Sequence, residues 1–316
     1  KVFYLPDTMA NWPWPRAINP HYEAVKIETD AWFCSFKSVD SESLKAFDKC
    51  NTEHLRVGCD VMDMQLIIDE VTDRRTGSGA KEIVDIVLDA LHNPHKIRPE
   101  GEHIIGEMMR QCSARAMQTM SMTCHPRFID KFTIYLRAVA VEAIDREQKH
   151  CLSIDDNFFK YRRESSGILP WLALCAMEID LPDEVFYHPA IVDMFECTAD
   201  LVTVENDMLS YNREQASGTH YNSLITVVML ELGLNIGSAM GWASAYHTKL
   251  KERFINGLAK IPSWGPSTDI LVKKYLDGLG NWVRASYCWS FDIERYLGPM
   301  TAEIQQSRLV PLLPKV

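Results

Sequence analysis

The sequence predicts an all-α fold in a single domain, and three observations lead to that prediction. Apolar residues recur at helical spacing in a series of long segments after residue 20. The run Leu224–Leu230 is rich in β-branched residues, but it lies within a longer helical segment and has no candidate partner strand. No repeat, low-complexity tract or linker divides the chain. We therefore expect an extended arm over residues 1–20 and one α-helical domain over residues 21–316.

The composition narrows the classes of function. The 316 residues are 47% hydrophobic and 24% charged, as in a globular protein with a substantial core. The net charge of −10 argues against a sequence-independent binder of nucleic acid or of an anionic membrane. Nine cysteines without a CxxC pair favour reduced thiols over a disulfide framework. With no secretory signal and no run of about 18 apolar residues, we expect a cytoplasmic protein without a membrane span.

The first elements are an arm and two helices. Proline cannot lie inside a regular helix, so the proline- and tryptophan-rich arm is predicted to be extended and anchored by its aromatic rings. A helix is predicted over residues 21–36, and a short one over residues 41–51 with Ser41 as its N-cap. The prolines and tryptophans of the arm are Pro6, Trp12, Pro13, Trp14, Pro15 and Pro20.

The next helix, over residues 57–73, is predicted to be buried because it is apolar on almost every side. It ends in acidic residues: Asp69 and Asp73 share a face, and Glu70 lies between them. Unpaired charge is costly to bury. The acidic end therefore either has a function or emerges into solvent.

The middle of the chain predicts four further helices and one kink. Gly167 lies within a helical pattern with Pro170 three residues later, which indicates a break or kink just after Arg162 and Arg163. Three long helices then follow over residues 191–214, 221–257 and 267–296, the last with a candidate break at Gly278 or Gly280. The four middle helices cover residues 81–92, 100–122, 127–150 and 153–171.

The helix over residues 191–214 ends in a row of oxygen-bearing side chains. Asn206, Ser210 and Glu214 are spaced four residues apart, so they lie on one side of the helix. Such a row, with a single carboxylate, suits Mg²⁺ when the phosphates of a substrate supply further charge. Arg213 lies beside Glu214 and is placed to meet that anion. Taken alone, such a row is more often a solvated helix face, because polar faces of this kind are common. If it faced the acidic end at Asp69, the two would hold Mg²⁺ at the mouth of an apolar cavity, an arrangement suited to a diphosphate ester with an apolar tail.

At this point the chain resembles the class I terpene synthases, and specifically the sesquiterpene synthases of basidiomycete fungi. Residues 69–73, DEVTD, resemble the D(D/E)xxD motif of the family, and residues 206–214, NDMLSYNRE, resemble its NDxxSxxxE metal motif. Arg295-Tyr296 resembles the C-terminal Arg-Tyr pair, with Trp289 six residues before it. The opening residues 5–22, with LPD, WPWPR and NPHY, resemble the basidiomycete branch. The likeness therefore runs almost end to end.

The resemblance implies a helical bundle around a central apolar cavity and a set of metal ligands. It implies three Mg²⁺ ions, with Mn²⁺ as a substitute, and leaves open whether Glu70 or Asp73 binds metal directly. The implied metal ligands are Asp69, Asp73, Asn206, Ser210 and Glu214.

The resemblance also implies a diphosphate site. The family carries a diphosphate-sensing arginine in the pattern Arg-x-x-(Asp/Ser/Thr)-Gly, which residues 163–167, RESSG, match. Arg163 is therefore the expected sensor and Arg162 the alternative, although both could be ordinary surface arginines of a charged helix. The implied catalytic and diphosphate-binding residues are Arg163, Arg213, Arg295 and Tyr296.

The implied reaction is metal-triggered ionisation of farnesyl or geranyl diphosphate in a cavity that excludes water. The product would be a cyclic or acyclic sesquiterpene, as hydrocarbon or alcohol, together with diphosphate. A chain-elongating prenyltransferase would carry a second Asp-rich motif at residues 206–214, and a non-catalytic isoprenoid-binding protein would have lost a metal ligand. The protein could be a monomer or a homodimer.

The expected cavity wall departs from the family in one respect. Family cyclases often place Phe one turn or more before the first acidic motif, whereas this chain has Met62, Gln65 and Leu66. A wall without aromatic rings stabilises a migrating cation poorly, and Gln65 could position a water, which favours an early-quenched alcohol of the linalool or nerolidol kind. Alternatively, Gln65 faces a neighbouring helix. Phe159 and Trp289 are candidates both for the pocket and for core packing.

Overall fold

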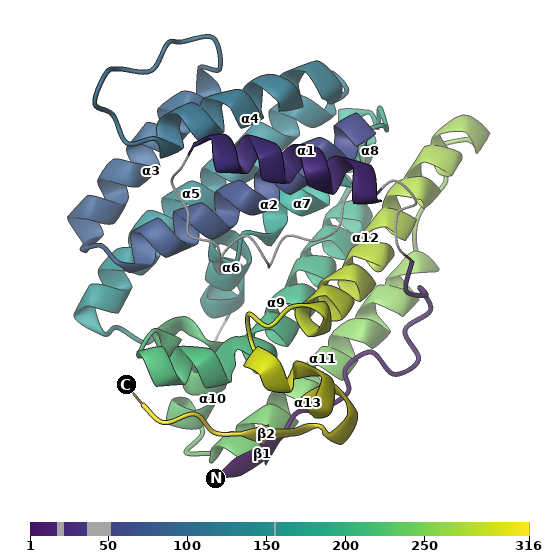
Figure 1. The fold of residues 1–316 in the computed structure, drawn as a ribbon. Helices are drawn as coiled ribbons and strands as arrows, with labels where there is room; N and C mark the ends of the chain where they lie inside the picture. Colours follow the sequence, from purple (N-terminus) through teal and green to yellow (C-terminus); the bar gives the residue numbers. More distant parts are fainter. Residues whose placement is uncertain (18–21, 37–51, 155, 316) are drawn as a thin grey trace. The chain divides into compact units, whose positions relative to one another are not determined.

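The computed structural model describes residues 1–17, 22–36, 52–154 and 156–315, and it confirms the all-α prediction (Figure 1). The helix predicted over residues 41–51 lies outside the described residues, as do Asn19, Pro20 and His21. The chain forms two compact units. The α2 unit comprises residues 17–147 and 169–180, and the α9 unit comprises residues 1–16, 148–168 and 181–316.

The α2 unit is built around the buried helix α2, Thr52–Asp73, which contacts α1, α3 and α4. Its core-facing residues follow the helical repeat, because Val57, Val61, Met64 and Ile68 are each fully buried. The prediction of a buried helix is therefore confirmed. The helices of this unit are α1 Tyr22–Ser35, α2, α3 Gly77–His92, α4 Ile105–Thr119, α5 Cys124–Gln148 and α7 Ile168–Leu174.

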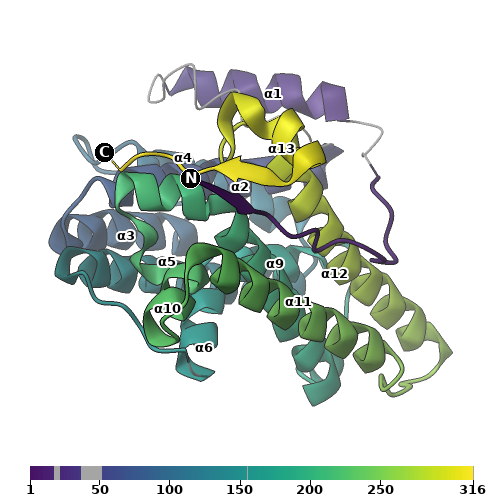
Figure 2. The same cartoon turned by 90° about the horizontal axis from the view of Figure 1, so that it is seen from below.

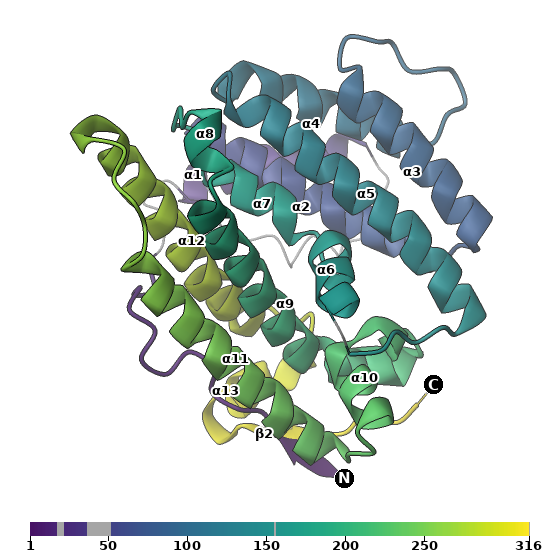
Figure 3. The same ribbon diagram turned by 180° about the vertical axis from the view of Figure 1, so that it is seen from behind.

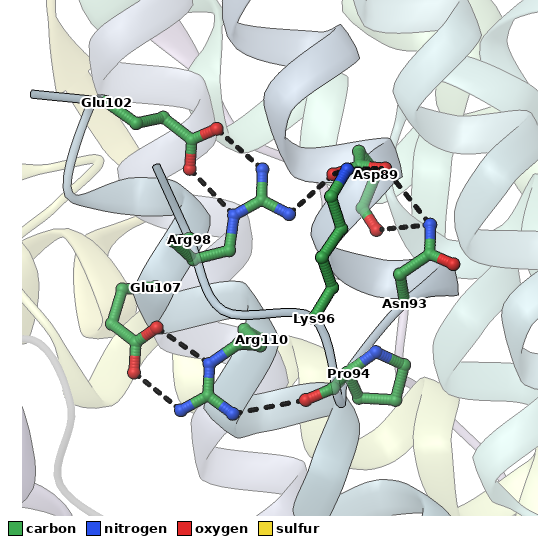
Figure 4. Close-up of polar contacts among 8 residues, drawn as sticks. All are labelled: Asp89, Asn93, Pro94, Lys96, Arg98, Glu102, Glu107 and Arg110. Atoms are coloured by element: carbon green, nitrogen blue, oxygen red, sulfur yellow. Dashed lines mark hydrogen bonds and ion pairs between the residues drawn. The ribbon is translucent and has the colours of Figure 1, made fainter. Parts of the chain in front are cut away.

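A network of ion pairs holds the loop between α3 and α4 (Figure 4). Arg98 donates to both carboxylate oxygens of Glu102, at 2.6 and 2.7 Å, and also to Asp89 on α3, at 2.6 Å. Lys96 and Arg98 hold the pKa of the Asp89 carboxyl below its usual value. Arg110 of α4 donates to the Pro94 carbonyl at 3.1 Å. The loop is thus fastened at both of its ends.

Helix α9, Pro189–Ser217, is the centre of the second unit and contacts α6, α8, α10, α11 and α12 (Figure 3). It is buried along most of its length, so its polar residues need partners within the fold. The helices of this unit are α6 Asp156–Ser165, α8 Asp183–Phe186, α9, α10 Leu224–Glu231, α11 Ile236–Leu258, α12 Pro266–Asp292 and α13 Thr301–Ser307, with short 3₁₀ turns at His220–Asn222 and Gly298–Met300.

Two predicted helix boundaries in this unit were wrong. The helix predicted over residues 221–257 is two helices, α10 and α11, because Gly233 adopts a left-handed backbone with φ 63° between them. The predicted break at Gly278 or Gly280 does not occur, and α12 runs without interruption. Gly280 is instead a point of close approach, since a Cβ there would lie 2.3 Å from the Trp14 ring.

The arm lies against α11 and α12, and residues 8–11 form a turn within it. It begins with strand β1, Val2–Tyr4, which pairs with β2, Leu309–Pro311, in an antiparallel register that sets Phe3 opposite Val310 (Figure 2). Trp12 donates its indole N–H to the Gly280 carbonyl at 2.9 Å. The rings of Trp12, Trp14 and Phe254 pack with centroids 5.1 to 5.6 Å apart.

Within the described part of the chain, no helix is by itself long and apolar enough to cross a membrane. Only α10 and α11 taken together reach the required length and apolar content, and they are bent by 115°.

Candidate functional site

The predicted metal row lies on one continuous helix. The His188 side chain caps the start of α9, and Gly218, with φ 81°, ends the helix just beyond the row. Ser210 is buried, while Asn206 and Glu214 are half-buried. Because α9 is unbroken from one end of the row to the other, the three side chains lie on the same side of the helix.

The hydroxyl of Ser210 is the most enclosed polar group of the row. Its hydroxyl oxygen is buried and has no hydrogen-bond partner among the described residues. A buried hydroxyl without a partner is costly, and a cation bound at the row would remove that cost. No group of three or more His, Cys, Asp or Glu in the described ranges is arranged to hold a metal. A cation at this row therefore needs the amide and hydroxyl oxygens, and further charge from a ligand.

The structure brings three predicted site residues together at the start of the row. Asn206 donates its amide N–H to the Tyr296 hydroxyl at 3.0 Å, which leaves the amide oxygen as the group that would coordinate a cation. The Tyr296 ring meets Trp289 of α12 edge to face, with centroids 6.0 Å apart. Arg295 is half-buried and Arg213 is exposed. Tyr296, 90 residues from Asn206 along the chain, is thus placed beside the metal row.

Arg162 is bound to α9 directly beside the row. It forms a buried ion pair with Asp207 and also donates to the Ser165 hydroxyl at 3.2 Å. Asp207 in turn accepts the backbone N–H of Leu224 at 2.7 Å, at the start of α10. This ion pair therefore joins α6, α9 and α10.

Arg163 points to an earlier turn of α9. It pairs with Glu196 at 2.6 Å and with Asp200 at 2.9 Å. Burial raises the pKa of the Asp200 carboxyl to about 7 and outweighs the opposing attraction of Arg163 and Arg253. Both candidate sensors are bound by carboxylates of α9, so the choice between Arg162 and Arg163 stays a prediction.

The predicted kink lies between α6 and α7. Gly167 has φ 76°, a conformation that glycine adopts without strain, and it separates the two helices. The Thr203 hydroxyl of α9 donates to the Ser166 hydroxyl at 3.2 Å. The break is therefore tied to the helix that carries the metal row.

Phe159 stacks on an aromatic pair that the sequence reasoning missed. Its ring lies 4.7 Å from that of Tyr246 on α11, and Tyr246 stacks in turn on Trp242 at 5.5 Å. Beside Phe159 lie Arg162, Asp207 and other residues of α6, α9 and α10, with no room for a water molecule between them. The four-residue spacing of Trp242 and Tyr246 was the signal that could have revealed this aromatic stripe.

In the α2 unit, the acidic end of α2 is partly neutralised by its own unit. Asp73 is exposed and pairs with Arg146 of α5 at 2.7 Å, and Arg146 also donates to the Thr72 carbonyl at 2.8 Å. Glu70 pairs with Arg74 one turn later. Asp69 is half-buried. Arg146 thus closes the C-terminal end of α2, where carbonyl groups lack helical partners.

Gln65 faces a neighbouring helix of the α2 unit. Its side-chain oxygen accepts the indole N–H of Trp171 on α7 at 2.6 Å. Met62 and Leu66 on either side are half-buried. The oxygen that would position a water already accepts a hydrogen bond, which agrees with the alternative placement of Gln65 against a helix.

Comparison with known proteins agrees with the motifs. The family model "Terpene synthase family 2, C-terminal metal binding" matches residues 60–253. The chain is 43% identical over 329 residues to sesquiterpene synthase 14 of Postia placenta, with 100% of this chain and 93% of the relative covered. It is 40% identical over 326 residues to the Δ(6)-protoilludene synthase of Armillaria gallica, with 99% and 94% covered.

Solved structures show the same fold at low sequence identity. An α-eudesmol synthase superposes with a TM-score of 0.78 at 16% identity, covering 89% of this chain and 98% of that one. A linalool/nerolidol synthase from Streptomyces clavuligerus gives a TM-score of 0.75 at 17% identity, covering 87% and 100%. The family match over residues 60–253 and the full-length identity to the fungal enzymes show that this chain belongs to the terpene synthase family.

Proposed function

We propose that the protein is a Mg²⁺-dependent sesquiterpene synthase that ionises farnesyl diphosphate and releases a cyclic sesquiterpene and diphosphate. The observation that carries the proposal is the row on α9. Its central hydroxyl, that of Ser210, is buried without a partner among the described residues, and a half-buried amide and carboxylate flank it. The full-length relatives named as sesquiterpene synthases support the size of the substrate.

The residues of the row would hold the metal through oxygen alone. The amide oxygen of Asn206, the hydroxyl of Ser210 and the carboxylate of Glu214 would be its protein ligands, and Asp69 would hold metal at the end of α2. Mg²⁺ bound to these oxygens would supply the positive charge that stabilises the departing diphosphate. We propose three ions in all, with Mn²⁺ as a substitute.

The arginines and Tyr296 would bind and orient the diphosphate. The guanidinium of Arg295 offers a planar pair of donors that suits phosphate oxygens, and exposed Arg213 would meet the same anion. Tyr296 accepts a hydrogen bond from Asn206 at 3.0 Å, which places its hydroxyl beside the row where it would donate to the diphosphate. Either Arg162 or Arg163 would act as the sensor once its carboxylate partner releases it.

A cyclic product is favoured over an early-quenched alcohol. The Gln65 oxygen, which would have positioned a water, accepts the Trp171 indole N–H. Several relatives of nearly full length are named Δ(6)-protoilludene synthases. An acyclic or monocyclic alcohol from farnesyl or geranyl diphosphate is the second candidate, because Met62, Gln65 and Leu66 place no aromatic ring at that position.

The test uses Ser210→Ala with Thr248→Ala as its control. Thr248 lies on α11 and is exposed, and its hydroxyl donates to the Ser244 carbonyl at 3.0 Å. Each protein is incubated with farnesyl diphosphate over a range of Mg²⁺ concentrations, with EDTA as the blank, and volatile products are identified by gas chromatography–mass spectrometry. Geranyl diphosphate is tested in parallel.

A metal ligand and a structural hydroxyl give opposite results in this test. We expect Ser210→Ala to require about tenfold more Mg²⁺ or more, and to be at least as stable as the wild type in EDTA, because an unpaired buried hydroxyl costs about 1–3 kcal/mol. Thr248→Ala should keep the wild-type Mg²⁺ dependence. If the wild-type protein, folded and supplied with Mg²⁺, converts neither diphosphate, the proposal fails in favour of a non-catalytic isoprenoid-binding protein.

A further inference from the structure

The side of α9 away from the metal row supports two segments from opposite parts of the sequence. Residues 1–10 and residues 309–313 meet at the β1–β2 pairing, and both belong to the α9 unit (Figure 2). Leu5 donates its backbone N–H to the Arg308 carbonyl, and Leu312 donates to the Lys1 carbonyl, each at 2.8 Å. The hydrogen bonding therefore extends beyond the strands at both ends. We call these two segments the terminal brace.

Two side-chain amides of α9 hold the second segment of the brace. Asn212 donates to the Pro311 carbonyl at 2.9 Å and accepts the Leu313 backbone N–H at 3.0 Å. Gln215 donates to the Leu313 carbonyl at 2.9 Å. Asn212 and Gln215 are only 4% and 5% exposed, so these hydrogen bonds have little competition from water.

The first segment is held by Glu205 and by one lysine. The Thr8 hydroxyl donates to the buried carboxylate of Glu205. Lys251 of α11 donates to the Thr8 carbonyl at 2.7 Å and to the Ala10 carbonyl at 3.0 Å. The brace therefore contacts α9 directly at Glu205, Asn212 and Gln215.

Two of these contacts are next to a candidate metal ligand, and the third, Asn212, lies between Ser210 and Glu214. Glu205 precedes Asn206, and Gln215 follows Glu214. With about 100° per residue, the contacts of the brace fall on the far side of the helix from the row. A shift of the brace would therefore rotate or tilt the turns that carry the row.

The last turn of α9 needs support of this kind. Glu214 lies only three residues before the end of the helix at Ser217, where the last carbonyl groups have no helical partner and helices fray. Gly218 and Thr219 donate to the Glu214 carbonyl at 2.9 and 3.0 Å, which fixes the backbone locally. Asn212 and Gln215 then anchor these two turns to β2 and the residues that follow it.

We propose that the terminal brace positions the metal row, and that Asn212 and Gln215 are positioning residues for metal binding by Glu214. The inference rests on the proposed function, because it requires that the row bind Mg²⁺. Loss of either amide would loosen the last two turns of α9 and spread the positions of the Glu214 carboxylate. The expected effect is weaker metal binding, as when outer partners of metal ligands are removed.

The test measures metal binding without turnover. The variants Asn212→Ala and Gln215→Ala are titrated with Mg²⁺ in the presence of inorganic diphosphate, and the rise in melting temperature gives the half-saturating Mg²⁺ concentration. Hydrogen–deuterium exchange then follows the backbone amides of residues 210–218. The control is Ser113→Ala, which removes a buried 2.7 Å hydrogen bond to the Leu91 carbonyl in the α2 unit.

The expected results separate positioning from general destabilisation. Both α9 variants should require about tenfold more Mg²⁺ or more and exchange faster over residues 210–218, while Ser113→Ala lowers the melting temperature and changes neither quantity. Variants that melt earlier but keep the wild-type Mg²⁺ midpoint and exchange would overturn the inference. If Mg²⁺ with diphosphate does not stabilise the wild type, the proposed function itself fails.

Discussion

Asp60 and Asp85 form ion pairs of the same length in very different surroundings. Asp60 of α2 accepts from Arg115 at 2.6 Å and from Arg56 at 2.8 Å, and its side chain is completely buried. Asp85 of α3 accepts from Lys81 at 2.6 Å, but its side chain is 59% exposed. Substitution by Asn removes the charge and keeps the shape, so Asp60→Asn and Asp85→Asn isolate the effect of burial.

The two substitutions should differ severalfold in cost. Breaking a buried ion pair costs about 3–5 kcal/mol, because the partner charge stays behind without compensation. Arg56 and Arg115 stay close, since both guanidinium groups pack on the Trp32 ring, 5.3 and 4.5 Å from its centroid. The side chains of Arg56 and Arg115 are 14% and 29% exposed, so hydration compensates part of the lost ion-pair energy. We therefore expect about 3 kcal/mol for Asp60→Asn and at most about 1 kcal/mol for Asp85→Asn.

The assay is urea unfolding of the wild type and both variants at low and high salt. High salt should erase the small cost of Asp85→Asn, because exposed charges are screened, and should leave most of the cost of Asp60→Asn. Equal losses of stability in the two variants, or a loss below about 0.5 kcal/mol for Asp60→Asn, would refute the reasoning. Burial would then not determine how much each ion pair contributes to the free energy of unfolding.

Burial lowers the pKa of His247 to about 3. The imidazole is therefore protonated near pH 6.5 in the unfolded chain but stays neutral at that pH in the folded chain. Stability should fall as the pH drops from 6.5, and His247→Leu should remove about 1.4 kcal/mol per pH unit of that slope in urea titrations. The sign reverses at Asp200, where the folded pKa is raised from 3.8 to about 7. The contribution of protonated Asp200 to stability is complete below pH 3.8 and is lost as the pH rises to 7. A rise from pH 5 to 7 should therefore destabilise Asp200→Asn less than the wild type. Parallel plots of stability against pH for the two proteins would contradict this. A Cβ at Gly280 would lie 2.3 to 2.6 Å from three atoms of Trp14, so Gly280→Ala should cost about 1–3 kcal/mol and change the tryptophan fluorescence. Gly241→Ala, with open space around it in α11, is the matched control and should stabilise the protein by up to about 1 kcal/mol.

Local spacing was enough to predict most of the helices and the row of oxygen-bearing side chains on α9. Asn206, Ser210 and Glu214 lie on one side of α9 because helical geometry is set by neighbouring residues, so the spacing alone specifies the row. The same is true of the buried face of α2. Features that depend only on the geometry of one helix could be predicted without knowledge of how the helices pack.

The partners of the site residues could not be predicted in this way. Gln65 meets Trp171, 106 residues later, and Thr8 meets Glu205, 197 residues later. No local pattern encodes such contacts, because they depend on how whole helices pack. Two glycines show the same limit: Gly233 ends a helix with a left-handed backbone, whereas Gly280 stays helical and makes room for the Trp14 ring.

The pairing of β1 with β2 also sets an order of events during protein synthesis. Residues 2–4 leave the ribosome early, but their partners at residues 309–311 are added only after the intervening chain has been made. At about 5–20 residues per second, the delay is roughly 15–60 s. Throughout that time β1 has an unpaired edge, the kind of surface to which other strands attach. The newly made protein therefore depends on residues 309–313 both to cover this edge and to complete the support of α9.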